Sequence, residues 1–239
     1  MKKMIVASTS TIYGGKFLEY LIPYLKAHFR SAHKLLFISY ARPGGMSYEA
    51  YTDIVKKGLK ELPILVQGIH EFEDPREAIK GAEAIFTGGG NTFVLMETLI
   101  RQGLIPVIRD VILKGTPYLG TSAGSNIVGP TVKTTNDMPI VLPSTLASLN
   151  LLPFNINPHY FDPDPESKHK GETRETRIKE FHAYNKETVV GLREGSWIAV
   201  DGDEIILKGG LQARIFKRGE APFEFESGRD MRILLKTKT

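Results

Sequence analysis

The chain has 239 residues, of which 41% are hydrophobic and 24% charged, and these proportions are typical of a globular protein with a sizeable core. Its 31 Lys and Arg residues exceed its 27 Asp and Glu residues by only four, and they are scattered along the chain, so the sequence indicates neither a nucleic-acid nor a membrane surface. The absence of cysteine excludes disulfides, thiolate metal sites and a cysteine nucleophile. No segment approaches the roughly 20 apolar residues that span a bilayer, and we expect a cytoplasmic protein.

Short apolar runs alternate with amphipathic stretches through the first half of the chain. The runs at 4–7, 35–38, 64–66, 84–86 and 117–119 predict strands, and the spacing of apolar residues predicts helices over 17–25, 47–62, 93–100 and 107–111. Asp74 and Pro75 begin a further short helix, because the aspartate accepts free N–H groups and a proline at the first helical position needs none. This alternation predicts an α/β fold with a mostly parallel sheet and helices on both faces.

The pattern changes after residue 189. Four short β runs follow at 189–192, 196–200, 204–207 and 213–216, separated by turn signals such as Asp201-Gly202-Asp203. No linker rich in Pro, Ser or Gly separates them from the earlier part. We therefore expect antiparallel strands added to the same sheet near the C-terminus, within a single domain spanning residues 1–239.

The segment Gly120-Thr121-Ser122-Ala123-Gly124 follows the last predicted parallel strand. A Gly-x-Ser-x-Gly pattern between a strand and a helix is typical of a nucleophile elbow, in which a tight turn needs small neighbours and raises the serine hydroxyl above the sheet. The helix behind it offers free N–H groups to an oxyanion. The alternative is that Ser122 simply caps a helix, and the pattern alone leaves both readings open.

A serine nucleophile needs a base and a group that orients the base. Of the six histidines, His159 stands out, since it follows an apolar run and Pro158 restricts Asn157 to extended conformations, which indicates a loop at a strand end. The others are interpreted as structural (His28, His33) or solvated (His70, His169, His182). Asp137 and Glu194 each lie at a turn beside a β run, and spacing cannot choose between them as the acid.

Six blocks of sequence between Gly88 and Trp197 resemble the peptidase E family, the α-aspartyl dipeptidases among the S51 serine peptidases. They are Gly88-Gly89-Gly90-Asn91-Thr92-Phe93, Gly120-x-Ser122-Ala123-Gly124, Thr134-Thr135-Asn136-Asp137-Met138-Pro139-Ile140, Ile156-Asn157-Pro158-His159, His169-Lys170-Gly171-Glu172-Thr173-Arg174-Glu175-x-Arg177-Ile178 and Glu194-Gly195-x-Trp197. This resemblance implies a serine peptidase on a sheet like that of class I glutamine amidotransferases, acting on dipeptides with an N-terminal α-aspartyl residue.

The resemblance also implies roles for individual residues. Ser122 is expected to attack the peptide carbonyl, His159 to transfer the proton, and Glu194 to orient the imidazole, with Asp137 as second choice for the acid. The amides of Gly89 and Ala123 are the expected oxyanion hole.

Arginine suits recognition of the aspartyl side chain, because its planar fork can meet a carboxylate with two hydrogen bonds. Arg174 is the first choice for this role and Arg177 the second, and Asn91 and Asp137 complete the set expected to contact substrate. Without the motif, the charges from Glu172 to Glu180 would be interpreted as a solvated helix face.

Two alternatives stay open. A related hydrolase resembling cyanophycinase would cut β-aspartyl bonds, and a non-catalytic binding protein could keep the elbow as architecture only. The histidines are dispersed and form no paired ligand motif, so we expect neither a metal nor a cofactor. The expected partner is a small Asp-X peptide, and the protein is expected to be a monomer or homodimer.

Overall fold

The computed structural model describes residues 1–163, 166, 168 and 171–235, and its strands form two sheets. The larger sheet has the order β3-β2-β4-β5-β1-β8-β9. It contains β1 (Lys3–Ala7), β2 (Lys34–Ile38), β3 (Leu65–Gly68), β4 (Ile85–Thr87), β5 (Tyr118–Thr121), β8 (Trp197–Asp201) and β9 (Glu204–Lys208). The first five of these are mutually parallel, and β8 and β9 extend the sheet in antiparallel fashion. The α/β fold predicted from the sequence is confirmed.

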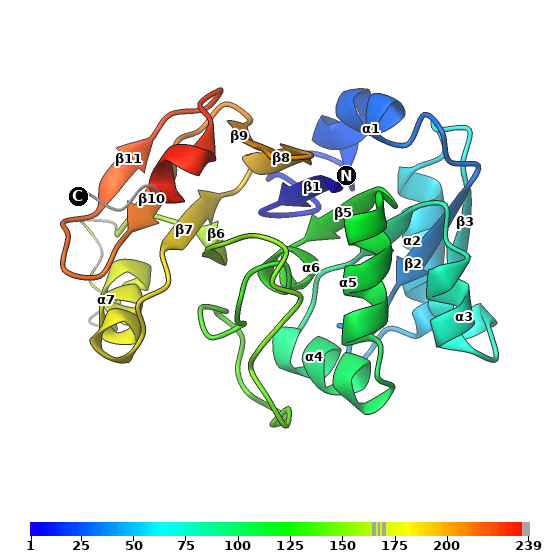
Figure 1. Cartoon of the computed structure of the whole chain (residues 1–239), viewed down its shortest axis with the longest axis horizontal. Coiled ribbons are helices and arrows are strands. Elements are labelled where there is room, and N and C mark those ends of the chain that lie inside the picture. The colour runs from blue at the N-terminus through cyan, green and yellow to red at the C-terminus, as the bar shows by residue number, and fades with distance from the viewer. Residues whose placement is uncertain (164–165, 167, 169–170, 236–239) are drawn as a thin grey trace.

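The smaller sheet has the order β11-β10-β7-β6 and lies with α7 at the left of Figure 1. It contains β6 (Asn155–Tyr160), β7 (Val189–Arg193), β10 (Ala213–Phe216) and β11 (Phe223–Phe225), with β6 parallel to β7. The sequence predicted that all four C-terminal runs join one sheet. That is correct for β8 and β9 and wrong for β7 and β10, because β7 pairs in parallel with β6 and antiparallel with β10 and so forms a second sheet away from β1.

Seven α-helices connect and cover the strands in the described part of the chain. They are α1 (Ile22–His28), α2 (Tyr48–Gly58), α3 (Pro75–Lys80), α4 (Thr92–Arg101), α5 (Ile105–Lys114), α6 (Ala123–Asn126) and α7 (Arg174–Tyr184), and 3-10 turns occur at Glu19–Leu21, Ile69–Glu71 and Met231–Leu235. Asp74 accepts from the amides of Arg76 and Glu77 and Pro75 begins α3, as predicted. The first predicted helix begins later than expected, because Leu18 has a positive φ of 58°.

Alternate residues of the parallel strands face two separate hydrophobic clusters. On β1, Met4 and Val6 pack with α3, α4 and α5, whereas Ile5 and Ala7 pack with α1 and α2. The first cluster continues into the smaller sheet through Ile156 and Leu192, so that the two sheets share a core. This fixes the position of β6 and β7 relative to the carboxyl ends of the parallel strands.

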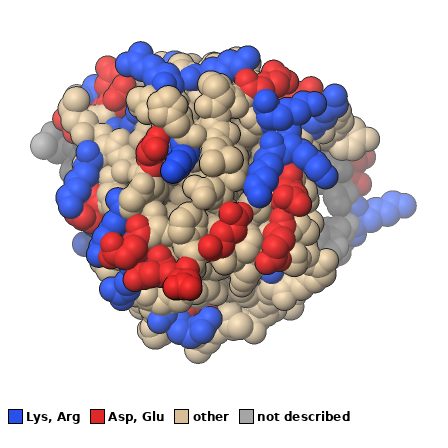
Figure 2. Space-filling model, turned by 90° about the vertical axis from the view of Figure 1, so that its right-hand side faces the viewer, with Lys and Arg blue, Asp and Glu red and all other residues tan. Residues whose placement is uncertain are grey.

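Charged side chains of both signs occur on the face that carries β3 and α3. Figure 2 shows this face, where Lys and Arg alternate with groups of Asp and Glu and no field of a single sign covers it. None of the helices in the described ranges is long and apolar enough to cross a bilayer.

Candidate active site

Ser122 and the segment Gly88-Gly89-Gly90 lie side by side because the strands that precede them, β5 and β4, are adjacent and parallel. β4 pairs with β5 in the register Thr87 to Gly120, so the residues that follow both strands emerge at the same edge of the sheet. A Cβ placed on Gly89 would lie 2.9 Å from the Ser122 Cβ, a distance that real side chains do not tolerate. Glycine at position 89 therefore allows the backbone to pass directly beside the serine.

The turn at Ser122 has the strained geometry of a nucleophile elbow. Ser122 has φ 54° and ψ −111°, and its amide donates to the carbonyl of Ala7 at 3.2 Å. A Cβ on Gly120 would lie 2.5 Å from the Gly124 carbonyl oxygen, and one on Gly124 would lie 2.0 Å from that of Thr87. The small neighbours are thus a steric requirement. The Ser122 hydroxyl makes no capping hydrogen bond to α6, which argues against the capping alternative.

His159 reaches this serine from the smaller sheet. The pairing of β6 with β7 shifts register between Pro158 and Tyr160, and His159 occupies the bulge with φ 55°. Bulges redirect side chains, and positive φ in a non-glycine residue is a strained conformation that often marks functional sites. The His159 Nε2 lies 2.8 Å from the Ser122 Oγ.

Glu194 lies in the turn between β7 and β8, on the other side of the imidazole. Because β8 runs antiparallel to β1 and Trp197 pairs with Ala7, the residues just before β8 lie at the edge where β1 ends. The Glu194 Oε1 is 2.6 Å from the His159 Nδ1. The three side chains therefore form a continuous chain from carboxylate to imidazole to hydroxyl.

The contacts from Glu194 to Ser122 are partly exposed and lie next to a buried tyrosine. The side chains of His159 and Glu194 are 36% and 47% exposed, and Tyr20 donates its hydroxyl to the Thr9 carbonyl at 2.6 Å nearby. Burial, and after it the negative charge of Glu194, raises the pKa of Tyr20 far above its usual value. The Tyr20 hydroxyl near Glu194 thus stays uncharged.

Two backbone amides near Ser122 are available to a ligand. Within the described residues, the amides of Gly89 and Ala123 donate to no hydrogen-bond acceptor. The peptide carbonyl of Gly89 accepts from the Tyr51 hydroxyl at 3.0 Å, and burial raises the pKa of that hydroxyl, so it stays a donor. This contact fixes the orientation of the loop that follows β4.

Asp137 and Asn91 both bond to backbone groups at the start of α4, and the hydrogen bonds of the described residues join neither to the imidazole. The Asp137 Oδ2 accepts from the Thr92 amide at 2.7 Å and from the Thr135 hydroxyl at 2.9 Å. Asn91 caps α4 by accepting from two amides of the first turn, and its Nδ2 donates to the Met138 carbonyl at 2.9 Å. The described contacts thus give both residues loop-shaping roles, and contact with substrate stays a prediction for both.

Arg174 is the first residue of α7 and is partly buried. Its guanidinium carbon lies 5.1 Å from the centre of the Phe161 ring, and its buried Nε has no hydrogen-bond partner in the described part of the chain. Burial lowers the pKa of Arg174, the neighbouring Arg177 adds to this effect, and the Asp137 charge opposes it. Arg174 is therefore within electrostatic range of Asp137, whereas Arg177 is 56% exposed and pairs with Glu172 at 3.7 Å.

The comparisons with known proteins show the family of the chain. The model of peptidase family S51 matches residues 4–208 of the chain. The chain belongs to peptidase family S51. A peptidase E of Streptomyces coelicolor is 43% identical over 235 residues, covering 98% of this chain and 96% of the relative. A probable alpha-aspartyl dipeptidase of Drosophila melanogaster is 40% identical over 238 residues, covering 98% of both chains.

Solved structures show the same architecture. A putative peptidase E protein from Listeria monocytogenes EGD-e superimposes with a TM-score of 0.65 at 25% identity, covering 88% of this chain and 99% of that one. A peptidase from an acI-B1 Actinobacterium, at 16% identity, has a TM-score of 0.71 with 96% of each chain covered, and shows the fold alone. The family resemblance and the peptidase class predicted from the sequence are confirmed.

The other histidines in the described part of this S51 chain lie outside the site. His28 is buried and its Nε2 lies 3.0 Å from the Tyr118 carbonyl oxygen, as expected for a structural residue. The prediction that His182 is solvated is wrong, because the residue is only 8% exposed and its Nε2 lies 3.0 Å from the Glu187 carbonyl oxygen. His70 also packs, with its ring 5.9 Å from that of Tyr48. His169 lies outside the described residues.

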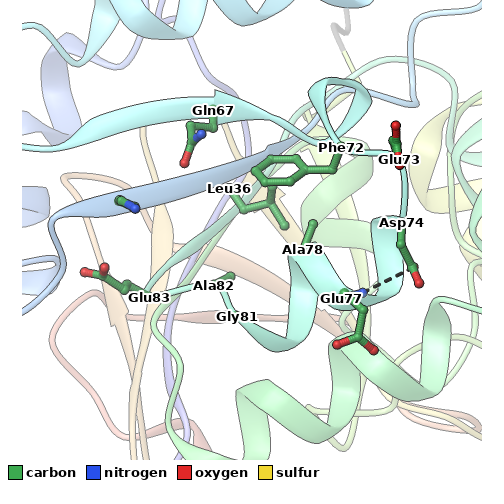
Figure 3. Close-up of a pocket in the computed structure, with 11 residues that line it drawn as sticks. Leu36, Gln67, Phe72, Glu73, Asp74, Glu77, Ala78, Gly81, Ala82 and Glu83 are labelled. Atoms are coloured by element: carbon green, nitrogen blue, oxygen red, sulfur yellow. Dashed lines mark hydrogen bonds between the residues drawn. The ribbon is translucent and has the colours of Figure 1, made fainter.

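A surface cavity of about 390 Å³ lies beside α3 in this S51 chain, where β2 and β4 begin. Figure 3 shows the Phe72 ring over Leu36 in its floor, with acidic side chains such as Glu77 and Glu83 at its rim. The strands that begin here end at the Ser122 edge, so the cavity is remote from the predicted site. Among the described residues, no three His, Asp or Glu side chains are grouped so as to hold a metal ion.

The sequence did not single out Ser8, although it contacts His159. Ser8 follows directly after β1 and its hydroxyl accepts from the His159 amide at 2.8 Å. The available signal was its place at the carboxyl end of a central parallel strand, where functional residues of α/β sheets gather.

Proposed function

We propose that this S51 peptidase hydrolyses dipeptides, and other very short peptides, that begin with an α-aspartyl residue. The observation that carries the proposal is the chain of contacts from Glu194 through His159 to Ser122, at 2.6 and 2.8 Å. A serine within hydrogen-bond reach of a base, which is itself oriented by a third group, is the arrangement of an activated nucleophile.

The reaction begins when the Ser122 Oγ attacks the scissile carbonyl and its proton passes to the His159 Nε2. Glu194 accepts from the Nδ1–H, which keeps Nε2 free as the base and stabilises the imidazolium that forms. His159 then gives the proton to the departing amine, and an aspartyl ester of Ser122 remains. A water molecule, activated by the same imidazole, hydrolyses this ester and frees the enzyme.

The negative charge on the attacked carbonyl oxygen needs donors that are already in place. We assign this role to the amides of Gly89 and Ala123, which are unpaired within the described residues and flank Ser122. Prearranged donors of this kind are worth about 10²–10³-fold in kcat each. The hydrogen bond from Tyr51 to the Gly89 carbonyl supports the assignment by fixing the peptide group that directly follows the Gly89 amide.

We assign recognition of the aspartyl side chain to Arg174. A partly buried guanidinium with an unpartnered Nε has hydrogen-bonding capacity to offer a carboxylate, and stacking on Phe161 restricts its direction. Asp137, with Asn91, supports this pocket from the start of α4. Arg177 is a weaker candidate, because it is exposed and already paired with Glu172.

The name of one relative supports the same substrate, and that of the other supports the peptidase class. The relative from Streptomyces coelicolor is called a peptidase E, and that from Drosophila melanogaster a probable alpha-aspartyl dipeptidase. Both match nearly the whole chain. Cytoplasmic location and a monomeric or homodimeric state also stay predictions for this protein.

The proposal is tested by offering purified protein Asp-Leu, its β-aspartyl isomer and Asn-Leu, with a metal chelator present and Ser122→Ala in parallel. We expect turnover of Asp-Leu only, and none by the variant. Cleavage of the β isomer would favour the cyanophycinase-like alternative. No turnover by folded wild-type protein would contradict the proposal.

A further inference from the structure

The peptide group between Pro158 and His159 is held at both of its ends by side chains. Its carbonyl oxygen accepts from the Asn136 Nδ2 at 2.7 Å, and its N–H donates to the Ser8 Oγ at 2.8 Å. Ser8 follows β1, and Asn136 lies in the loop between α6 and β6. Side chains from two distant parts of the chain thus hold the peptide group that directly precedes the proposed base, His159.

The Ser8 hydroxyl has a fixed direction. It is fully buried and donates to the Leu192 carbonyl at 2.7 Å, which leaves a lone pair for the His159 amide. The Ser8 amide donates to the Ser196 carbonyl at 3.1 Å, in the turn after Glu194. Ser8 therefore connects the sheet that carries the nucleophile to the strand that carries the base and to the turn that carries the acid.

The Asn136 carboxamide is fixed in a similar way. Its Oδ1 accepts from the Asn157 Nδ2 at 2.8 Å, and the same Nδ2 donates to the Thr134 carbonyl at 2.8 Å. With its oxygen engaged, the carboxamide can present only its NH₂ to the Pro158 carbonyl.

This peptide group decides where the imidazole points. His159 has φ 55° in a bulge, a conformation that the surrounding structure must enforce, because L-residues with side chains seldom adopt it. Rotation of the preceding peptide group would let φ relax to negative values and swing the ring away from Ser122. Holding both ends of the group blocks that rotation.

We propose that Ser8 and Asn136 are positioning residues that keep His159 directed at Ser122. Neither touches the reacting atoms, and the inference rests on the proposed triad. A displacement of about 1 Å can cost on the order of 10²-fold in rate. We therefore expect Ser8→Ala and Asn136→Ala each to lower kcat by about 10- to 100-fold while KM for Asp-Leu changes little.

The matched control is Ser39→Ala. Ser39 is also fully buried and follows directly after a parallel strand, but its hydroxyl has no hydrogen-bond partner in the described part of the chain. We expect this variant to keep wild-type kcat. If it lost as much as Ser8→Ala, the loss would reflect a buried hydroxyl at this edge in general, and the proposal would be wrong.

Two further readouts separate the positioning role from substrate choice. The first is the rate at which diisopropyl fluorophosphate inactivates the enzyme, since this reagent needs an activated serine but no aspartyl group. The second is the proton NMR signal of the His159 Nδ1–H, which reports the hydrogen bond to Glu194 without any turnover. We expect the reagent to inactivate Ser8→Ala and Asn136→Ala more slowly than wild type, in proportion to their loss of kcat. Both variants should also lose or broaden the NMR signal while their melting transition stays cooperative.

The outcomes are distinct. The proposal would be overturned if Ser8→Ala and Asn136→Ala folded and kept the wild-type inactivation rate and an unchanged NMR signal. Should Ser8→Ala fail to fold, Asn136→Ala, at a partly exposed position, decides the question by the same measurements. Wild-type protein that reacts with the reagent but leaves Asp-Leu intact would refute only the substrate, whereas wild-type protein that neither reacts with the reagent nor cleaves any of the three peptides would refute the triad and this inference with it.

Discussion

Replacing Glu194 by glutamine tests the assignment of the acid. Glutamine keeps the size of the side chain but removes its charge, and its NH₂ can turn toward the His159 Nδ1. The imidazole would then carry its proton on Nε2, facing Ser122, and could no longer act as the base. The matched comparison is Asp137→Asn, at the other acid considered from the sequence, whose carboxylate bonds to Thr92 and Thr135 instead.

The expected magnitude follows from the geometry. A carboxylate and an imidazolium whose charges lie about 4 Å apart attract by about 4 kcal/mol at an effective dielectric constant of 20. Since both side chains are more than a third exposed, we reduce this to about 2 kcal/mol for solvent screening, or about 30-fold in rate. Loss of the correct tautomer in a buried triad costs about 10⁴-fold in kcat. We expect a fall of about 10²–10³-fold, between these two limits.

The assay is steady-state hydrolysis of Asp-Leu by wild type and the two variants, with circular dichroism to verify folding. Glu194→Gln should lower kcat with little change in KM, because Glu194 acts through His159, which transfers the Ser122 proton and does not bind substrate. Asp137→Asn should lower kcat far less and act mainly through KM. A larger loss of kcat in Asp137→Asn than in Glu194→Gln would refute the assignment of the acid.

Three further predictions concern specificity, packing and pH. Arg174→Met should lower kcat/KM for Asp-Leu and abolish the preference for Asp-Leu over Asn-Leu, whereas Arg177→Met should keep that preference; an unchanged preference in Arg174→Met would remove this residue from substrate recognition. Gly124→Ala would place a Cβ 2.0 Å from a backbone carbonyl oxygen, and should cost roughly 3 kcal/mol of unfolding free energy, while Gly210→Ala, which meets nothing within 4 Å, should be close to neutral in urea denaturation. Burial lowers the pKa of His28 from 6.5 to about 4, so the unfolded chain binds its proton first as the pH falls, and this residue should cost about 3 kcal/mol of stability between pH 6.5 and pH 4. A folded His28→Gln variant should lose correspondingly less stability over that range, and parallel stability curves for the two proteins would contradict the prediction.

Features that depend only on neighbouring residues could be predicted from the sequence. The period of the apolar residues predicted the parallel strands and most helices, and the Asp74-Pro75 pair predicted the start of α3. The glycines around Ser122 predicted a tight turn, and the structure shows that a Cβ at either would collide with backbone. Such features can be predicted because the steric contacts and hydrogen bonds that cause them join residues close together in the sequence.

The choice among polar residues with similar local patterns needed the tertiary structure. Asp137 and Glu194 both follow turn signals, and only the pairing of β8 with β1 brings Glu194 to the imidazole while Asp137 bonds to the start of α4. His159 lies 37 residues from Ser122 in the chain, and its ring is directed by a bulge that no local pattern announces.

The division of the C-terminal strands between two sheets was equally beyond the sequence. β7 and β8 have the same apolar character, yet β7 pairs with β6 and β8 with β1. Strand partners are selected by long-range packing, which the composition of a single strand does not encode. The contact between Ser8 and His159 spans 151 residues and exists only because that packing brings the two sheets together at the carboxyl edge.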